Sequence, residues 1–282
     1  MDTYYDLFGK DLVEGYKPLI INALNDSEGV KYTFVSDVSS LQLLNSTYMS
    51  ELIYRAHFGG ASSLVRNLEW VKGMAVAYEH GMLLPFASSF RSLIESTGDS
   101  SQALIAVAKT LADNHKIISD CIAEKANNVY SIKELEDLLI HYSHGRRLQR
   151  GEEAPETHKA KSAAFYVNNL KEQTGKDFYE CYSELCQLTH PAADSVLHLM
   201  LPKAGNNYEF SVGDGKKKIE ELMSKYDHLI TDLLMFAFNP GLLILKTLNH
   251  LPVSDCHSAS LVHADFSWLP LWVKCEQSLS RT

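Results

Sequence analysis

Apolar residues recur every three or four positions along most of this chain. This spacing places them on one face of an α-helix, so the sequence predicts a largely helical protein. The predicted helices cover about residues 12–25, 37–58, 61–80, 84–97, 99–127, 132–145, 157–174, 177–188, 191–201, 216–238 and 241–249.

Glycines and capping residues set the expected ends of these helices. Gly59-Gly60 is expected to end one helix, and Asp99 to cap the start of another. Ser131 and Glu134 form an S-x-x-E capping box ahead of an apolar run, which predicts a helix that begins just after the serine.

Two short segments alternate apolar and polar residues, which is typical of β-strands. They cover residues 31–35 and 208–212, and we predict that they pair. The predicted fold class is therefore all-α, an antiparallel bundle of about ten helices with a minor short strand pair. Residues 1–45 are expected to form an N-terminal helical segment, 46–250 the main helical domain and 251–282 a C-terminal extension packed on it.

The composition narrows the class of protein. Of 282 residues, 45% are hydrophobic and 22% charged, which excludes intrinsic disorder. The formal net charge of −9 excludes a protein that coats nucleic acid with its whole surface, so any RNA contact must be local. Five cysteines without a C-x-x-C spacing, and no export signal at the N-terminus, lead us to expect a cytoplasmic protein.

The most apolar stretch of the chain covers residues 229–245. It is about as long as a membrane span, but Asp232 and an Asn-Pro-Gly sequence at 239–241 interrupt it. We therefore expect a buried helix that ends at Asn239, and no membrane span.

Two groups of polar residues are candidates for a functional site. Arg91 and Glu95 are four residues apart, which places them on one face of a predicted helix. Such a pair is either an intrahelical salt bridge or a partly buried site where arginine binds further acceptors. His190 precedes Pro191 at a predicted helix junction, where an imidazole can transfer protons, contact a phosphate or cap the next helix.

These residues lie in two segments that carry a family resemblance. FRSLIES contains Arg91 and Glu95, and about a hundred residues later Tyr182 and His190 stand in a Tyr-x-x-Leu-x-x-x-x-His-Pro pattern. The pair of segments resembles a bacterial helical family of uncharacterised proteins related to the HEPN superfamily, whose better-known members are RNA-cleaving toxins and antiphage defence factors. The resemblance covers about residues 45–240 in layout. It implies an all-helical fold in which the four named residues form a polar cluster inside the bundle, at a dimer interface.

The chain departs from the catalytic members of that superfamily, which carry an arginine followed by four to six residues and a histidine on one helix. No arginine here has that spacing. Lys109 and His115 have it, but lysine lacks the planar fork that binds phosphate through two hydrogen bonds. A metal-independent ribonuclease needs a base for the 2′-hydroxyl and a cation for the charge that develops at phosphorus. His190 and Arg91 would supply these groups from different helices.

Our leading hypothesis is a HEPN-like intracellular protein that binds or cleaves RNA in antiphage defence or a toxin system. Its catalytic residues would be Arg91, Glu95 and His190, and Tyr182 would contact the substrate. The alternative is a non-catalytic helical interaction or dimerisation module of a larger complex. The expected partners are therefore RNA, and a second copy of the chain or another protein.

The remaining charged patterns have weaker functional interpretations. Arg146 and Arg147 can contact RNA phosphates as substrate-binding residues, although the glutamates that follow favour a solvated surface. Lysines 216–218 are interpreted in the same way. His141 and His144 lie one helical turn apart without an H-E-x-x-H motif, so we expect no metal. No P-loop, G-x-G-x-x-G or G-x-S-x-G motif is present, and we expect no cofactor.

Overall fold

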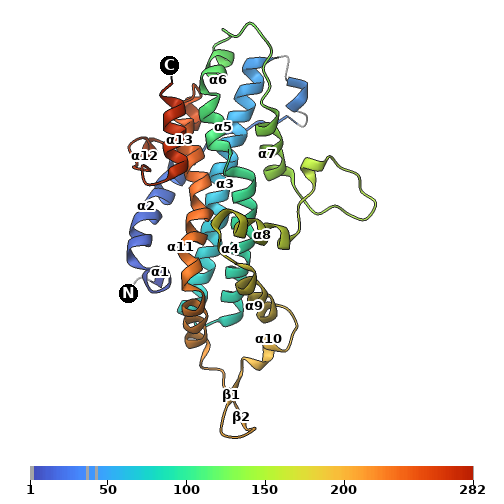
Figure 1. Ribbon diagram of the computed structural model, residues 1–282, viewed down its shortest axis with the longest axis vertical. Coiled ribbons are helices and arrows are strands. Elements are labelled where there is room, and N and C mark those ends of the chain that lie inside the picture. The colour runs from blue at the N-terminus through green and yellow to red at the C-terminus, as the bar shows by residue number, and fades with distance from the viewer. Residues whose placement is uncertain (1–2, 36–37, 42–43, 282) are drawn as a thin grey trace. The chain divides into compact units, whose positions relative to one another are not determined.

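Figure 1 shows the computed structural model, which describes residues 3–35, 38–41 and 44–281. The protein is a packed helical bundle, 70% helical, with one short antiparallel two-stranded sheet, so the predicted fold class is confirmed. The helices are α1 (Thr3–Phe8), α2 (Lys10–Ser27), α3 (Asn45–Glu79), α4 (Leu83–Leu104), α5 (Val107–Asp113), α6 (His115–Ile122), α7 (Lys133–His144), α8 (Ala163–Thr174), α9 (Tyr179–Thr189), α10 (Asp194–Leu197), α11 (Gly215–Leu248), α12 (Ala259–Val262) and α13 (Pro270–Leu279). The strands are β1 (Met200–Pro202) and β2 (Tyr208–Phe210), and short 3₁₀ turns cover Val38–Leu41, Glu156–His158 and Ser254–Cys256.

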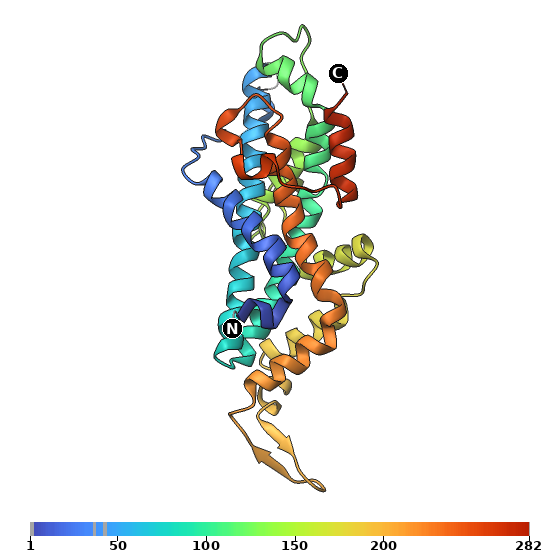
Figure 2. The ribbon, with the colours of Figure 1, turned by 90° about the vertical axis from the view of Figure 1, so that its left-hand side faces the viewer.

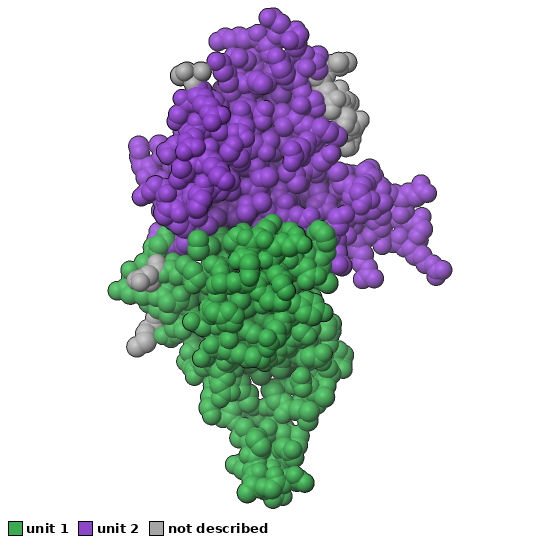
Figure 3. Space-filling view, in the orientation of Figure 1, with its two compact units in different colours: residues 1–15, 66–98, 163–237 green, residues 16–65, 99–162, 238–282 purple. Residues whose placement is uncertain are grey.

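Contacts within the chain group it into two compact units (Figure 3). Unit 1 contains Met1–Gly15, Arg66–Gly98 and Ala163–Ala237, and unit 2 contains Tyr16–Val65, Asp99–Ser162 and Phe238–Thr282. Each unit therefore combines segments that are distant in the sequence. The predicted division into an N-terminal segment, a main domain and a C-terminal extension instead follows the order of the chain.

Helix α3 runs through Gly59 and Gly60, so the predicted helix end at this glycine pair is wrong. Asp37, where the preceding helix was expected to begin, lies outside the described residues. A Cβ atom on Gly60 would lie 3.3 Å from the carbonyl oxygen of Gly241 in α11, and one on Gly241 would lie 2.7 Å from that of Gly60. These glycines therefore allow two helices of unit 2 to pack with their backbones in contact, which offsets their low helix propensity.

Helix α4 likewise continues past Gly98, so the predicted helix start at Asp99 is wrong. A Cβ atom on Gly98 would lie 2.5 Å from the backbone oxygen of Tyr166 in α8. The position therefore accepts only glycine without a shift of the backbone, because α8 crosses α4 there.

Alanine substitution at Gly98 should destabilise the protein, whereas the same change in another helix should not. We expect Gly98→Ala to lower the free energy of unfolding by about 1–3 kcal/mol, because the added methyl group overlaps Tyr166. Gly15, inside α2, has no atom within 4 Å of its Cβ position, so Gly15→Ala should raise stability by up to roughly 1 kcal/mol. Urea denaturation of both variants measures these changes, and a stabilised Gly98→Ala would contradict the predicted overlap.

Helix α11 continues through Pro240, so the expected end at Asn239 is also wrong. A proline inside a helix costs about 3 kcal/mol. Leu242 and Leu243 are fully buried just beyond it, and burial contributes about 1.5–3 kcal/mol per leucine side chain. Packing on both sides of the proline therefore outweighs its local cost.

Helix α11 is also the one helix in the described ranges that is long and apolar enough to cross a membrane. Within its most apolar window, 67% of the residues are buried inside the protein. Length and composition of this kind are shared by core helices of soluble proteins, so the helix by itself is weak support for a span.

The predicted start of α7 is nearly correct, since the helix begins at Lys133, but the capping box does not form. Instead, the hydroxyl of Tyr48 accepts a hydrogen bond from the backbone N–H of Ile132 at 3.2 Å and donates one to Glu136 at 3.1 Å. A tyrosine of α3 therefore satisfies the helix start that Ser131 was expected to cap.

The short sheet is formed by a different pair of segments from the pair that was predicted. Tyr208–Phe210 pairs with Met200–Pro202 as a hairpin, and residues 31–35 form no strand. A nearby partner lowers the loop entropy of pairing. The backbone of Val35 bonds to side chains of α3 instead of to a strand. Its N–H donates to Glu51 at 3.1 Å, and its carbonyl oxygen accepts from Arg55 at 2.8 Å.

Candidate functional site

Four predicted site residues, Arg91, Glu95, Tyr182 and His190, belong to unit 1. Arg91 and Glu95 lie one turn apart on α4, with Nε of the arginine 3.5 Å from Oε1 of the glutamate. Their side chains are 23% and 32% exposed, so the pair is partly buried. Solvent therefore reaches part of each side chain.

Helix α9 supplies the partners of this pair. The hydroxyl of Tyr182 donates a hydrogen bond to Oε1 of Glu95 at 2.8 Å, and Nη1 of Arg91 donates one to Oγ1 of Thr189 at 3.0 Å. Tyr182 and Thr189 are seven residues apart, which places them on the same helix face two turns apart. The structure thus brings together Arg91, Glu95 and Tyr182, three of the four residues that the resemblance grouped, and adds Thr189. Among the described contacts, none joins the side chain of His190 to these residues.

Thr189 is the residue that the sequence interpretation missed. Its signal was present, since it lies seven positions after Tyr182 and directly before His190. A short hydroxyl side chain has no distinctive pattern of its own, because serines and threonines often bond to the preceding helical turn. Thr189 does so here too, since its hydroxyl also donates to the carbonyl oxygen of Leu185 at 2.8 Å.

His190 lies at the end of α9, where the chain turns to extended geometry. Its backbone N–H bonds to the carbonyl oxygen of Cys186 at 2.9 Å, and its side chain is exposed. The predicted helix end before Pro191 is therefore confirmed. The helix predicted over residues 191–201 is wrong in its bounds, because α10 covers only Asp194–Leu197 and Met200–Pro202 forms β1. His190 directly follows Thr189, the residue that accepts the hydrogen bond from Arg91.

The electrostatics of the cluster follow from its partial burial. Burial raises the pKa of Tyr182, and its hydrogen bond to Glu95 raises it further, so the phenol stays protonated. Nε of Arg91 is buried and has no hydrogen-bond partner among the described residues. Because Nε is buried, the donors that remain for an anion are those on Nη1 and Nη2 that the bond to Thr189 does not use.

The other two predicted site residues, Arg146 and Arg147, lie in unit 2. Arg146 forms an ion pair with Glu152, which also accepts a hydrogen bond from the backbone of Gln149 at 3.0 Å. That pairing lowers the pKa of Glu152 to about 2. Arg147 is exposed. The nearby glutamate therefore neutralises part of this basic cluster, as the sequence indicated.

Each of the lysines at the start of α11 has an internal partner. Lys216 lies over the ring of Tyr78 at 4.5 Å, and Lys217 lies 3.7 Å from Glu221. Lys218 donates a hydrogen bond to the backbone oxygen of His198. These contacts leave less positive charge available to a ligand than the sequence suggests.

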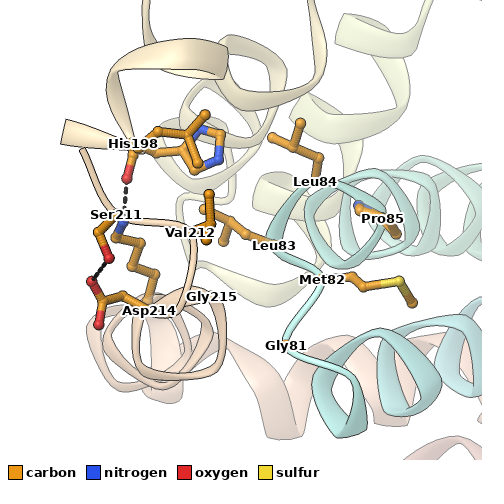
Figure 4. A pocket seen from close by; sticks show the side chains of 12 residues that line it. Gly81, Met82, Leu83, Leu84, Pro85, His198, Ser211, Val212, Asp214 and Gly215 are labelled. Atoms are coloured by element: carbon orange, nitrogen blue, oxygen red, sulfur yellow. Dashed lines mark hydrogen bonds between the residues drawn. The ribbon is translucent and has the colours of Figure 1, made fainter.

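A cavity of about 200 Å³ lies in unit 1 between the start of α4 and the base of the hairpin (Figure 4). Its apolar wall consists of Met82, Leu83, Leu84, Pro85, Leu199 and Val212. On the polar side, Ser211 donates a hydrogen bond to Asp214 at 2.7 Å, beside Lys218. Sites for drug-sized ligands are usually about 300–1,000 Å³, so this cavity fits a single side chain better than a cofactor.

No three metal-binding side chains gather within the part of the chain that the structure describes. The ring of His144 instead stacks on that of His158, with 5.2 Å between their centres, and His141 bonds to the backbone oxygen of Thr157 at 3.0 Å. All five cysteines are free thiols. The polar cluster on α4 and α9 is thus the site best suited to chemistry on an anion.

Comparisons with known proteins identify no relative of this chain. No protein-family model matches the chain, and neither a curated protein nor a solved structure matches it.

Proposed function

We propose that this protein binds RNA through the cluster formed by Arg91, Thr189 and His190 in unit 1. The observation that carries the proposal is the 3.0 Å hydrogen bond from Arg91 to Thr189, the residue that directly precedes the exposed His190. The guanidinium is bonded to the residue that directly precedes a solvent-exposed histidine, and guanidinium and imidazole groups are both suitable contacts for a phosphodiester. The HEPN-like resemblance of the two segments agrees with this function.

The expected binding mode is local and depends on phosphate contacts. The net charge of −9 repels a polyanion, so affinity must come from the few cationic contacts at the cluster. Glu95 lies beside Arg91, and its bond from Tyr182 fixes its carboxylate in place. In this arrangement Glu95 orients the guanidinium, while His190 and the remaining arginine donors contact the nucleic acid.

The test is fluorescence anisotropy with a single-stranded RNA oligonucleotide over a range of salt concentrations. Arg91→Ala and His190→Ala should each weaken binding by about tenfold, and Arg91→Ala should reduce the slope of log K against log salt by about 0.7, the value of one phosphate contact on a single strand. Arg281→Ala removes an exposed arginine of unit 2 and is the control for net charge. Wild-type affinity and slope in both cluster variants would contradict the proposal.

The same samples test the finer hypothesis of cleavage. A metal-independent ribonuclease would lose activity in both Arg91→Ala and His190→Ala, in buffer that contains a chelator. Cleavage that persists in both variants would assign the activity to a contaminant or to another site. Circular dichroism of each variant checks that the helical content is unchanged.

A non-catalytic interaction module is the second candidate, and a specific observation favours it. The polar cluster is bonded within itself, through Tyr182 to Glu95 and Arg91 to Thr189, so it can fix how α4 and α9 pack. In addition, the hairpin exposes large apolar residues, among them Tyr208 and Phe210. Loss of stability without any loss of RNA binding in Arg91→Ala would favour this candidate.

A further inference from the structure

The β1–β2 hairpin extends away from the helices of unit 1, as both Figure 1 and Figure 2 show. Within the described part of the chain, the sheet has these two strands alone. The backbone bonds from Ser211 to Leu199 and from Lys203 to Asn207 show which residues pair inside the hairpin. By the alternation of an antiparallel ladder, the N–H and C=O groups of Tyr208 and Phe210 point outward from β2.

The large apolar side chains of β2 are exposed to solvent. Tyr208 and Phe210 lie on one face of the strand, because they are two residues apart. Val212 follows in a bend just beyond the end of β2. These side chains are 60%, 71% and 78% exposed. Single exposed apolar residues are common on soluble proteins, but a contiguous row on an open strand edge marks an interaction site.

The two edges of the hairpin are not equivalent. The outward-facing residues of β1 are Met200 and Pro202, and proline has no N–H to donate. Proline thus blocks the β1 edge against a further strand, whereas β2 keeps both of its outward residues free to pair. The charges of the hairpin cancel locally, since Lys203 lies 2.5 Å from Glu209. This ion pair therefore reduces the repulsion between two approaching hairpins.

We infer that a second copy of this chain docks along β2, so that two hairpins form a four-stranded antiparallel sheet around a twofold axis. An isologous contact of this kind requires a self-complementary strand, and β2 is one. With Phe210 on the axis, Phe210 faces Phe210 of the second copy. Tyr208 then faces Val212 of the second copy, and this requires the bend at Val212 to straighten and extend the strand. Aromatic and β-branched residues form favourable cross-strand pairs of this type.

The pairing register follows from the one charged residue of β2. With Phe210 on the axis, Glu209 faces Ser211 of the second copy. A shift that puts residue 209 on the axis would place the two Glu209 carboxylates directly opposite each other, which is destabilising. A shift that puts Ser211 on the axis would place Tyr208 opposite residue 214, beyond the strand, so the tyrosine would lose its cross-strand partner. Val212 also lines the cavity beside the hairpin together with Met82 and Leu84, whose side chains are partly exposed (Figure 4).

This inference does not depend on RNA binding, and its test needs no ligand. Sedimentation equilibrium of the full chain should show a dimer that dissociates on dilution. Phe210→Asp should raise the dimer dissociation constant by at least about tenfold, because the substitution places two like charges on the axis. Val129→Asp, at an exposed apolar position of unit 2, is the matched control and should leave the constant unchanged. A wild-type chain that is monomeric at every soluble concentration would overturn the inference.

Cysteine crosslinking then identifies the register. Residues that face each other as a hydrogen-bonded antiparallel pair have Cα atoms about 5.5 Å apart, within the range of a disulfide. Phe210→Cys should therefore form an intermolecular disulfide under mild oxidation, and Glu209→Cys should crosslink far less. Dimers that crosslink through residue 209 alone, or a wild-type dimer that Phe210→Asp leaves intact, would also overturn the proposed pairing.

Discussion

Arg55→Met should lower the free energy of unfolding by about 3–5 kcal/mol, which is the usual cost when one partner of a buried ion pair is removed. Arg55 and Glu51 lie one turn apart on α3, and their side chains are only 2% and 7% exposed. The loss would leave a buried carboxylate without its counter-charge, and desolvation of an unpaired charge is costly.

The surroundings of Arg55 explain why this pair matters more than others in the chain. Its Nε and Nη2 atoms lie 3.0 and 2.9 Å from Oε1 of Glu51, and Nη2 also donates to the carbonyl oxygen of Val35 at 2.8 Å. The guanidinium stacks 4.7 Å from the ring centre of Phe34. One arginine therefore fastens the segment that precedes α3 to the helix itself, and methionine supplies none of these hydrogen bonds.

A double variant separates the ion pair from simple packing. Glu51→Leu together with Arg55→Met removes both charges, and well-packed apolar replacements of buried pairs are often neutral, so we expect it to recover at least half of the loss. The exposed pair of Lys10 and Glu14 has the same spacing, and Lys10→Met should cost no more than about 0.5 kcal/mol. Urea denaturation gives all of these values. A double variant less stable than Arg55→Met would refute the buried-charge explanation.

The sequence predicts the helices well because burial on one helix face leaves a periodic pattern. The predicted helix ends at Gly59-Gly60, Gly98 and Asn239 are wrong because local propensity favours an end there and tertiary packing decides otherwise. The one helix predicted over 99–127 is also wrong, since this stretch is divided among α4, α5 and α6. Gly60 and Gly98 are helical because another backbone passes within contact distance of each. These contacts could not be predicted from the local sequence, because each joins residues that are far apart along the chain.

The sequence could predict contacts of the candidate site only between residues of the same helix, since these follow from helical spacing. Arg91 and Glu95 share a face of α4 by their spacing, and Tyr182 shares a face of α9 with Thr189. The pairing between the two helices came from the family resemblance, and the hydrogen bonds from Tyr182 and Arg91 show which atoms meet. The exposed row on β2 was not foreseen, because its alternation led us to expect a strand paired with residues 31–35.

Stability should also fall as the pH drops from 7 to 5, and buried His57 should account for much of the change. Burial lowers the pKa of His57 from 6.5 to about 4 in the folded protein. The unfolded chain therefore binds a proton near pH 6.5, while the folded chain resists it until about pH 4. The stabilisation by neutral His57 is complete above pH 6.5, declines as the pH falls toward 4, and amounts to about 2 kcal/mol lost at pH 5.

The contacts of His57 explain why it stays neutral when folded. Its side chain is fully buried on α3, and Nδ1 lies 2.6 Å from the hydroxyl of Tyr32. The tyrosine ring packs against it, with 5.9 Å between ring centres. Burial also raises the pKa of Tyr32 to about 12, so the phenol remains neutral and supplies no negative charge that would stabilise an imidazolium.

The measurement is the free energy of unfolding in urea at pH 7 and pH 5 for the wild type and for His57→Asn. Asparagine keeps a polar group near the Tyr32 hydroxyl but cannot take up the proton, so this variant should lose about 2 kcal/mol less than the wild type between the two pH values. Comparing the change within each protein cancels any pH-independent cost of the substitution. His263→Asn, at an exposed position, should follow the wild type. If His57→Asn instead shows the full pH dependence of the wild type, His57 does not carry it, and the other histidines whose pKa is lowered by burial, His144 and His250, become responsible.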